Sequence, residues 1–477
     1  MRIALFALAA AVVTTSPAWA QAGAARPPAP DTAKKPASYV AGALSTPNAD
    51  PFPSTYKARE SRPTAITNVT ILTGTGARIE RGTVVLMNGR ITAVGANIAA
   101  PAGATVIDGA GKWLTPGLID THSHLGVYSA PSVEANSDGN EATNPNTAQV
   151  WAEHSVWPQD PQFPRALAGG ITTMQVLPGS ANLFGGRSVV LKNVPGRSVQ
   201  EMKFPGAKYG LKMACGENPK RVYAQRGPST RMGNVAGYRA AWIAAEQYRR
   251  RWDKWLEKRE GDPPPRDLQN ETLAEVLRGN IFVQNHCYRA DEMVQMIDIA
   301  HEFGYSIRSF HHGVEAYKIA DLLAKEGISA SIWSDWGGFK MEALDGVRGN
   351  LALVDAAGAR AIVHSDDATG TQRLNQDAAK GVAAGAQLGI AIAPEQAIKW
   401  ITINPAWALG LDDKIGSIEV NKNADVILWT GNPFSVYTKP ERVWIDGALL
   451  FDRTDPKSWW KTDFELGFVP AVMGGIR

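Results

Sequence analysis

Short apolar runs alternate with longer amphipathic stretches through the middle of the chain. Apolar residues three or four apart mark helical stretches such as residues 290–303 and 314–325. The apolar runs predict eight strands, at residues 113–120, 171–177, 188–191, 209–215, 281–285, 306–310, 329–333 and 361–364. Eight strands alternating with helices over about 300 residues predict an α/β fold of the (β/α)8 TIM-barrel type. A doubly wound open sheet is disfavoured, because no Gly-x-Gly-x-x-Gly motif opens a helix here.

The two ends of the chain carry a different, strand-rich pattern. Residues 64–113 hold β-rich runs joined by Asn88-Gly89, and residues 415–453 hold a matching pattern with Asp446-Gly447. Both dipeptides favour tight hairpin turns. We therefore expect a small β-sandwich domain built from both chain ends. A barrel over residues 114–414 would lie between them in the sequence, and residues 454–477 would form a C-terminal tail.

One connection within the predicted barrel is long and helical. Residues 236–258 place large side chains at helical spacing, among them Trp242, Tyr248 and Trp252. This stripe favours a helix that packs its aromatic face on the barrel. A lid over the functional site is the alternative.

The first twenty residues resemble a secretory signal peptide. Arg2 supplies the positive charge, residues 3–13 are apolar, and residues 18–20 form a small-x-small cleavage site after Ala20. The apolar run is too short to span a bilayer, so we expect no stable membrane insertion after cleavage. The mature protein is expected to be periplasmic or secreted. Residues 21–63 predict an extended N-terminal segment, either a linker or a strap on the surface.

Composition narrows the class of protein. The 477 residues are 44% hydrophobic and 20% charged, which excludes a disordered or coiled-coil chain. The net charge of +3 is small for a nucleic-acid binder, so we expect no nucleic-acid partner. Only two cysteines are present, Cys215 and Cys287, which excludes a four-thiolate zinc site. A disulfide between them and two free thiols both remain open.

Histidine or aspartate stands at the ends of four predicted strands. His122 and His124 end the first strand, and their spacing of two points both imidazoles to the same side. The other such residues are His286, the pair His311 and His312, and Asp366. A barrel brings these strand ends to one mouth, where active sites of this fold lie. The pattern predicts a metal site of imidazole and carboxylate ligands.

These motifs resemble the metal-dependent amidohydrolase superfamily, in its imidazolonepropionase-like and prolidase-like branch. Pro-Gly-Leu-Ile-Asp-Thr-His-Ser-His at residues 116–124 is similar to the superfamily's first-strand motif. His286 is similar to its fifth-strand histidine, His312-Gly313 to its sixth-strand motif, and Asp366 to its eighth-strand aspartate. The resemblance covers roughly residues 64–453.

The resemblance implies two divalent metals per subunit, usually Zn²⁺, that share a hydroxide. It implies these ligands: His122, His124 and Asp366 on one ion, and His286 and His312 on the other. A bridging group is expected from the fourth strand. We favour Glu217, which lies just past the strand end, over a carboxylated Lys212 within the strand. His311 or His364 would stabilise the oxyanion or orient the ligands.

The expected function is therefore that of an exported metal-dependent amidohydrolase. Metal-activated hydroxide would attack a carbonyl or amidine carbon and cleave a C–N bond of an amide, cyclic amide or dipeptide, with Asp366 shuttling the proton. The partner is a small-molecule substrate, and a homo-oligomer is left open. Alternatives are a deaminase or phosphotriesterase on the same site, or a non-catalytic metal-containing binding protein.

Overall fold

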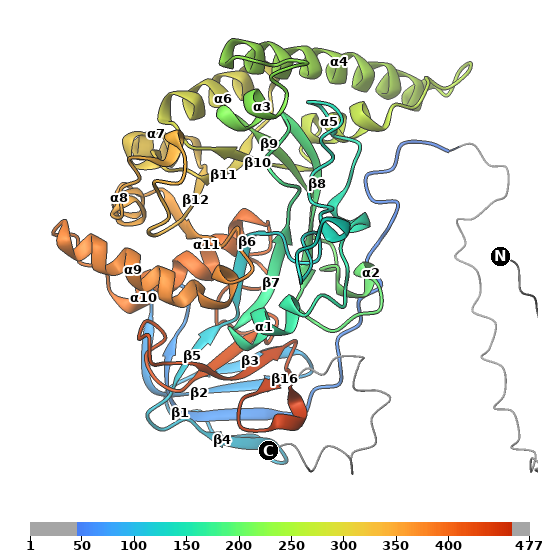
Figure 1. Ribbon diagram of the computed structural model, residues 1–477. Coiled ribbons are helices and arrows are strands. Elements are labelled where there is room, and N and C mark those ends of the chain that lie inside the picture. Colours follow the sequence, from blue (N-terminus) through green and yellow to red (C-terminus); the bar gives the residue numbers. More distant parts are fainter. Residues whose placement is uncertain (1–44, 460–477) are drawn as a thin grey trace, which may run out of the picture. The chain divides into compact units, whose positions relative to one another are not determined.

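Eight strands follow one another in chain order around a barrel (Figure 1). The computed structural model describes residues 45–459, so the expected signal peptide and its cleavage site lie outside the described residues. The chain divides into two units, residues 1–46 and 47–477, and all elements below belong to the second. The barrel strands are β6 (Leu118–Ser123), β7 (Ile171–Val176), β8 (Phe184–Lys192), β9 (Gly210–Ala214), β10 (Phe282–Cys287), β11 (Ile307–His312), β12 (Ser329–Ile332) and β13 (Arg360–Val363).

The third barrel strand departs from the simple β/α alternation. β8 pairs antiparallel with both β7 and β9, and no helix separates it from β7, whereas the remaining pairs in this sheet are parallel. Residues 177–183 turn the chain back directly, so β7 and β8 form a hairpin at the carboxyl ends of the parallel strands. The prediction of a (β/α)8-type barrel is confirmed, with this one strand reversed.

Hydrogen bonds near the carboxyl ends link the first barrel strand to the segment after the last. The backbone N–H of Asp366 donates to the carbonyl of His122 at 2.9 Å. The buried carboxylate of Asp120 accepts hydrogen bonds from Ser365 N at 3.2 Å and from Thr371 Oγ1 at 2.7 Å. These contacts join β6 to the segment that follows β13.

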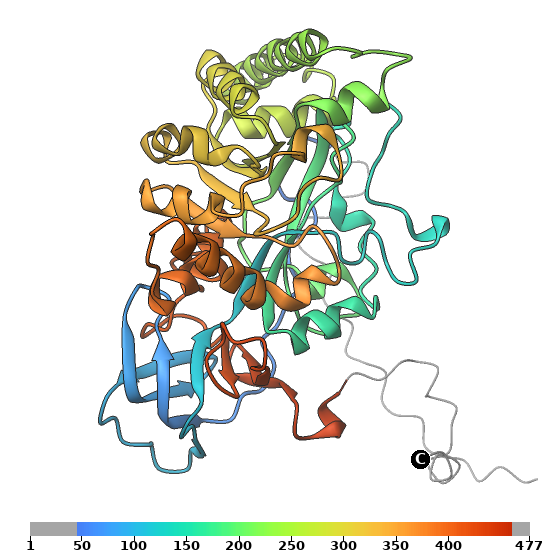
Figure 2. The same cartoon turned by 60° about the vertical axis from the view of Figure 1, so that its left-hand side comes forward.

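A second sheet is built from both ends of the chain. Its strands are β1 (Thr64–Leu72), β2 (Arg78–Met87), β3 (Arg90–Gly95), β4 (Thr105–Asp108), β5 (Trp113–Pro116), β14 (Val426–Trp429), β15 (Pro440–Ile445) and β16 (Ala448–Asp452). β5 pairs with β14, which joins the two ends of the chain in one sheet with its own apolar core. Figures 1 and 2 show the blue N-terminal strands and the red C-terminal strands together beside the barrel. Residues 113–120, expected as one strand, are split between the two sheets.

Both predicted hairpin turns are present in this second sheet. Asn88-Gly89 joins β2 to β3, and Asp446-Gly447 joins β15 to β16. All four residues have positive φ, between 48° and 77°. Asn, Asp and Gly adopt this conformation at the lowest cost, which explains why these dipeptides close the hairpins.

Helices cover the outside of the barrel. They are α1 (Gln162–Ala168), α2 (Val199–Met202), α3 (Glu217–Val222), α4 (Arg231–Lys258), α5 (Leu268–Leu277), α6 (Ala290–Phe303), α7 (Ala320–Glu326), α8 (Asn350–Ala356), α9 (Leu374–Gln387), α10 (Pro394–Ala397) and α11 (Ile403–Ala408). α4 buries Tyr238, Trp242 and Trp252, so the aromatic stripe packs inward as the spacing predicted. Within residues 45–459, no helix has the length and apolarity needed to cross a membrane.

The described part of the N-terminal segment lies against the barrel. Residues 47–63 contain no helix or strand. Asp50 accepts a hydrogen bond from the buried Lys203 Nζ at 2.8 Å, and the carbonyl of Ala49 accepts one from Arg187 at 2.8 Å. Polar anchors of this kind hold an extended segment in place without secondary structure.

Candidate metal centre

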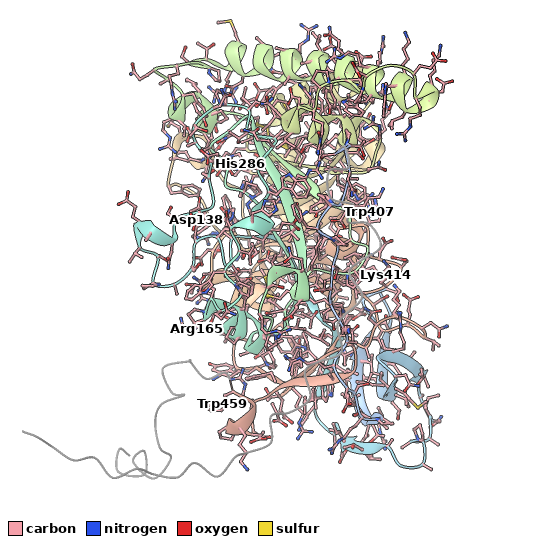
Figure 3. All side chains as sticks on the ribbon, turned by 90° about the vertical axis from the view of Figure 1, so that its right-hand side faces the viewer. Asp138, Arg165, His286, Trp407, Lys414 and Trp459 are labelled. Carbon is pink, nitrogen blue, oxygen red and sulfur yellow. A yellow bond between two sulfur atoms is a disulfide. The ribbon has the colours of Figure 1, made fainter. Side chains whose placement is uncertain are left out.

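Histidines from three strands converge at the mouth of the barrel. His122 lies in β6, His286 in β10 and His312 at the end of β11, while His124 and Asp366 come directly after β6 and shortly after β13. In Figure 3, His286 lies on the side of the unit nearest the long helix α4. Parallel strands place their carboxyl ends at one rim, which is why these residues meet although they are far apart in sequence.

Asp366 is the carboxylate around which the histidines gather. Its Oδ1 lies 3.2 Å from His122 Nε2 and 3.0 Å from His124 Nε2, and its Oδ2 lies 3.9 Å from His312 Nδ1. The candidate ligand atoms of His122, His124 and Asp366 all lie within 4.8 Å of one another. His122, His312 and His364 form a second group that meets the same criterion. Four of the predicted ligands, His122, His124, His312 and Asp366, are thus brought together.

Local backbone geometry turns two of these side chains into the site. His312 has a φ of 71° and Asp366 a φ of 58°. Adjacent residues of a regular strand point to opposite faces, so His311 and His312 would otherwise diverge. With His312 in the left-handed region, both rings face His122, at centroid distances of 4.8 and 4.7 Å. Such backbone strain in a residue other than glycine is concentrated at functional sites.

His311 lies behind His122 rather than beside an open cavity. Its Nδ1 hydrogen-bonds His122 Nδ1 at 2.9 Å, and its Nε2 hydrogen-bonds Gln284 Oε1 at 2.8 Å. Both ring nitrogens are therefore engaged, and the side chain is fully buried. The predicted direct role of His311 toward an oxyanion does not fit this position, whereas its predicted alternative, orienting a ligand, does.

His286 and His364 each have one ring nitrogen that points at no partner among residues 45–459. These atoms are His286 Nδ1 and His364 Nδ1. His364 Nε2 lies 3.1 Å from His312 Nδ1, and the ring of His286 lies 4.4 Å from that of His312. Buried polar atoms normally have a partner, so orphaned imidazole nitrogens indicate room for a further ligand or ion.

Lys212, not Glu217, lies against the histidine cluster. Lys212 Nζ is 3.2 Å from His122 Nε2, and the Lys212 side chain is fully buried. Glu217 begins α3, and its carboxylate lies 3.7 Å from Lys340. Neither group of candidate ligands contains Glu217. Glu217 stays a prediction as the bridging group: it lies just past β9 at the start of α3, whereas Lys212 within β9 is the candidate that contacts His122.

Burial sets the charge state of the cluster. It lowers the pKa of His122, His286 and His312 well below the usual value, with nearby cations adding to the effect, so these imidazoles are neutral at pH 7. Burial opposes ionisation of Asp366, but the hydrogen bond from His124 and neighbouring cationic groups hold its pKa below the usual value. Neutral imidazoles beside an ionised carboxylate are the ligands that zinc prefers, so the residues fit a divalent cation.

Asp120 is a positioning residue whose role the motif did not reveal. Its Oδ1 accepts a hydrogen bond from the backbone N–H of His122 at 3.1 Å, and the hydroxyl of Ser365 donates to its carboxylate. It therefore ties the His-x-His segment to the segment that carries Asp366. The position of Asp120 two residues before His122 was visible in the sequence, but the partners across the barrel were not.

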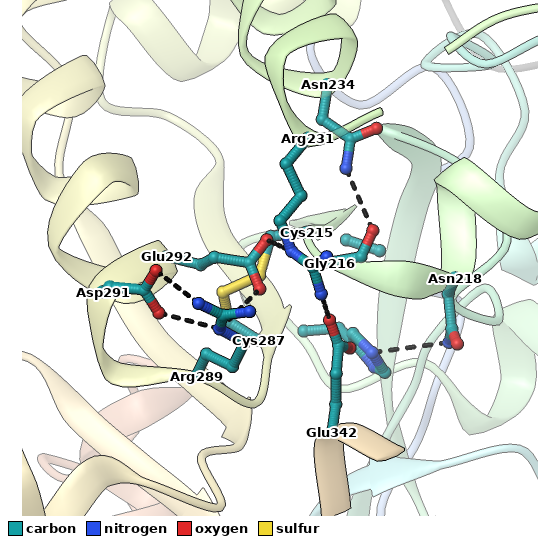
Figure 4. The surroundings of a disulfide bond; sticks show 12 residues. Cys215, Gly216, Asn218, Arg231, Asn234, Cys287, Arg289, Asp291, Glu292 and Glu342 are labelled. Carbon is teal, nitrogen blue, oxygen red and sulfur yellow. Dashed lines mark hydrogen bonds and ion pairs between the residues drawn. A yellow bond between two sulfur atoms is a disulfide. The ribbon is translucent and has the colours of Figure 1, made fainter. Parts of the chain in front are cut away.

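A disulfide joins two strand ends beside the cluster. Cys215, directly after β9, is bonded to Cys287 at the end of β10, next to His286 (Figure 4). Of the two alternatives that the cysteine count left open, a disulfide or two free thiols, the structure shows the disulfide. The other histidines lie away from the cluster: His154 is half-exposed beside Glu153, and His301 pairs with Glu326 on the surface.

Comparisons with known proteins agree with this geometry. The model of the amidohydrolase family matches residues 113–450. Amidohydrolase tasK of Hapsidospora irregularis is 34% identical over 399 residues, or 78% of this chain, and the match spans only 40% of that protein's length. The imidazolonepropionase of Shewanella frigidimarina is 24% identical over 74% of this chain and 86% of its own length. A crystal structure of an amidohydrolase from Thermotoga maritima is 37% identical with a TM-score of 0.76, covering 82% of this chain and all of that one.

Proposed function

The chain belongs to the amidohydrolase family, and we propose that it is an exported zinc enzyme that hydrolyses the C–N bond of a small amide, cyclic amide or dipeptide. The family match and the similarity to imidazolonepropionases confirm the resemblance that the sequence motifs indicated. The observation that carries the proposal is the gathering of His122, His124 and His312 around the single carboxylate of Asp366.

We assign the metal ligands by the resemblance to the family. His122, His124 and Asp366, whose ligand atoms lie together, would hold one ion, and His286 and His312 a second. Lys212 would bridge them as a carbamate, formed when its neutral amine adds to CO2 with release of one proton. Burial lowers the pKa of Lys212 to about 7, so a substantial fraction of the amine is neutral at physiological pH. When bound, the metal supplies Lewis acidity that activates water and polarises a carbonyl.

The protein's own groups manage the protons. Asp366 is the ionised carboxylate among the proposed ligands. Its side chain is 23% exposed, so water and substrate can reach it. We assign it the transfer of a proton from water to the leaving nitrogen. His364 hydrogen-bonds His312, and burial lowers its pKa to about 4, so it is neutral when it orients that ring.

Export is proposed from two features of the chain. Residues 1–20 have the composition of a signal peptide. The Cys215–Cys287 disulfide supports the same location, because disulfides persist in oxidising compartments and are rare in the cytosol.

The test combines metal analysis with a substrate panel. Purified protein, supplemented with zinc and bicarbonate, is expected to bind close to two zinc ions per chain and to hydrolyse at least one member of a panel of dipeptides, N-acyl amino acids and cyclic amides. A chelator should abolish turnover and added zinc should restore it. Metal-loaded protein that is inert on the panel but releases ammonia from an amine substrate would favour a deaminase instead. Protein that binds no metal would refute the proposal.

A further inference from the structure

A lysine lies at the rim of the site without being one of the proposed ligands. Lys340 belongs to residues 333–349, which connect β12 to α8. Its Nζ donates a hydrogen bond to Asn218 Oδ1 at 2.9 Å, and Asn218 Nδ2 lies 3.4 Å from His286 Nε2. One amide side chain therefore separates this ammonium group from a proposed metal ligand.

The surroundings hold the ammonium group near the surface of the site. Lys340 Nζ lies 4.0 Å from the ring centroid of Tyr288, whose ring is 4.7 Å from that of His286. Its side chain is 18% exposed, which leaves it accessible to a ligand in the barrel mouth. The carboxylate of Glu217 lies 3.7 Å from Lys340 Nζ, a long distance for an ion pair. A hydrogen-bond donor this close to the ligands is suited to an anionic group on the substrate.

A buried carboxylate fixes the segment that carries Lys340. Glu342 Oε1 accepts a hydrogen bond from the backbone N–H of Glu217 at 2.9 Å and also pairs with Arg231 at the start of α4 (Figure 4). A Cβ at Gly216 would lie 2.7 Å from Glu342, so glycine permits this close approach. These contacts tie the loop to α3 and α4. The backbone at Lys340 is therefore held in place by Glu342, independently of the Lys340 side chain.

Two other cations of this region have different surroundings. Arg226 donates to the carbonyls of Ala142 and Thr143, and so supports a neighbouring loop. Arg348 lies on the same loop as Lys340 and lines a cavity of about 270 Å³ together with His312 and Trp333. Of these three cations, Lys340 is the one linked to His286, through the side chain of Asn218.

We propose that Lys340 binds the carboxylate of the substrate and orients its scissile C–N bond toward the metal ligands. A single ammonium group with a nearby Glu217 suits a monoanion better than a phosphate dianion. The aromatic side chains of Trp333, Trp336 and Phe339 on the same loop favour an apolar group next to that carboxylate. The substrate class is then an N-acyl amino acid or dipeptide with an apolar side chain. This inference rests on the proposed function.

The test uses zinc-loaded full-length protein and matched substrate pairs. Each pair consists of an N-acetyl amino acid or dipeptide with an apolar side chain, with a free carboxylate in one member and an N-methylamide in the other. The wild type should prefer the carboxylate by about 10- to 100-fold in kcat/KM, the range expected for a hydrogen bond to a charged group. Lys340→Met should abolish the preference by raising KM for the carboxylate alone, and Lys340→Arg should retain part of it. Zinc content should not change.

Lys318→Met is the matched control, because it removes an exposed lysine that pairs with Glu315 outside this loop. It should keep the preference of the wild type. Equal use of both members by the wild type, a preference that survives in Lys340→Met, or loss of the preference in Lys318→Met would each overturn the assignment. Zinc-loaded wild type that hydrolyses no pair would instead contradict the proposed function, independently of Lys340.

Discussion

Two buried clusters of titratable groups lie toward opposite ends of the barrel strands, and they are built differently. At the end near the second sheet, Lys192 Nζ lies 2.9 Å from Asp446 and 3.4 Å from Asp425, and all three side chains are at least nine-tenths buried. At the mouth, several neutral imidazoles and Lys212 surround one carboxylate, Asp366.

The difference separates a structural cluster from a functional one. In the Lys192 cluster, opposite charges meet and hydrogen-bond, which is how proteins make buried charges tolerable. At the mouth, some imidazole nitrogens lack a hydrogen-bond partner. His286 Nδ1 and His364 Nδ1 have none within the described part of the chain. Such a cluster is completed by binding something, so mutations should affect folding in the first cluster and chemistry in the second.

The largest effect on activity is expected from Asp366→Asn. The amide cannot accept the proton from water, and general acid–base groups contribute about 10²- to 10⁴-fold to rates. We expect kcat to fall by that range on the best panel substrate, with little change in melting temperature. Asp253→Asn, which removes from α4 an exposed partner of Arg278, is the control and should leave both quantities near wild type. Unchanged turnover in Asp366→Asn would contradict the role assigned to Asp366.

The Lys192 cluster should respond in the opposite way. Lys192→Met leaves two buried aspartates without their cation, and breaking a buried pair in this way costs about 3–5 kcal/mol of unfolding free energy. Chemical denaturation should show this loss, while kcat/KM of the protein that remains folded stays unchanged. The matched control is Lys112→Met, which removes the partly exposed pair with Glu441 and should cost about 1 kcal/mol or less. A large loss of kcat/KM without loss of stability in Lys192→Met would remove the distinction between the clusters.

The strand ends explain why much of the mouth could be predicted. His122, His124, His286 and His312 follow apolar runs, and the barrel geometry then places them together. The same reasoning could not predict the left-handed backbone conformation of His312. This conformation allows the rings of both His311 and His312 to face His122. That feature depends on tertiary contacts and has no periodic signal.

Connections were harder to predict than strands. The reversal of β8 depends on the short turn at residues 177–183, and apolar periodicity is the same for both strand directions. The choice between Glu217 and Lys212 depends in the same way on the connection after β9, where α3 begins at Glu217 and its carboxylate lies 3.7 Å from Lys340. Lys340 itself lies on a loop, where composition carries little information about position.

Replacing Lys212 and Glu217 tests which of them completes the cluster. Lys212→Met should weaken zinc binding by about 10- to 100-fold, the range seen when a group supporting a metal site is lost. Glu217→Gln, the matched control on the same connection, should leave zinc affinity unchanged. Metal titration measures both, and peptide mass analysis of zinc-loaded wild type should show a carbamate on Lys212. Loss of zinc in Glu217→Gln but not in Lys212→Met would instead support Glu217 as the bridging group, as the sequence predicted.

The smallest effect is expected from Glu292. Its charge is only partly paired, because it shares Arg231 with a second carboxylate, Glu342, so it lies between the paired Lys192 cluster and the histidine cluster at the mouth. Burial, with the charge of Glu342 adding to it, raises the pKa of Glu292 from 4.5 to about 7. The folded state therefore binds this proton more tightly than the unfolded state. The resulting stabilisation is fully present below pH 4.5 and is lost as pH rises through 7.

Glu292→Gln cannot titrate and should remove this part of the pH dependence. The free energies of unfolding at pH 5 and pH 8 should then differ by on the order of 1 kcal/mol less than they do in the wild type. Glu302→Gln offers a surface control, because Glu302 pairs with Arg239 in solvent, and it should leave the difference between the two pH values as in wild type. If Glu292→Gln behaves like this control, then Arg231 neutralises Glu292 fully, and the rim network belongs with the paired Lys192 cluster rather than between the two.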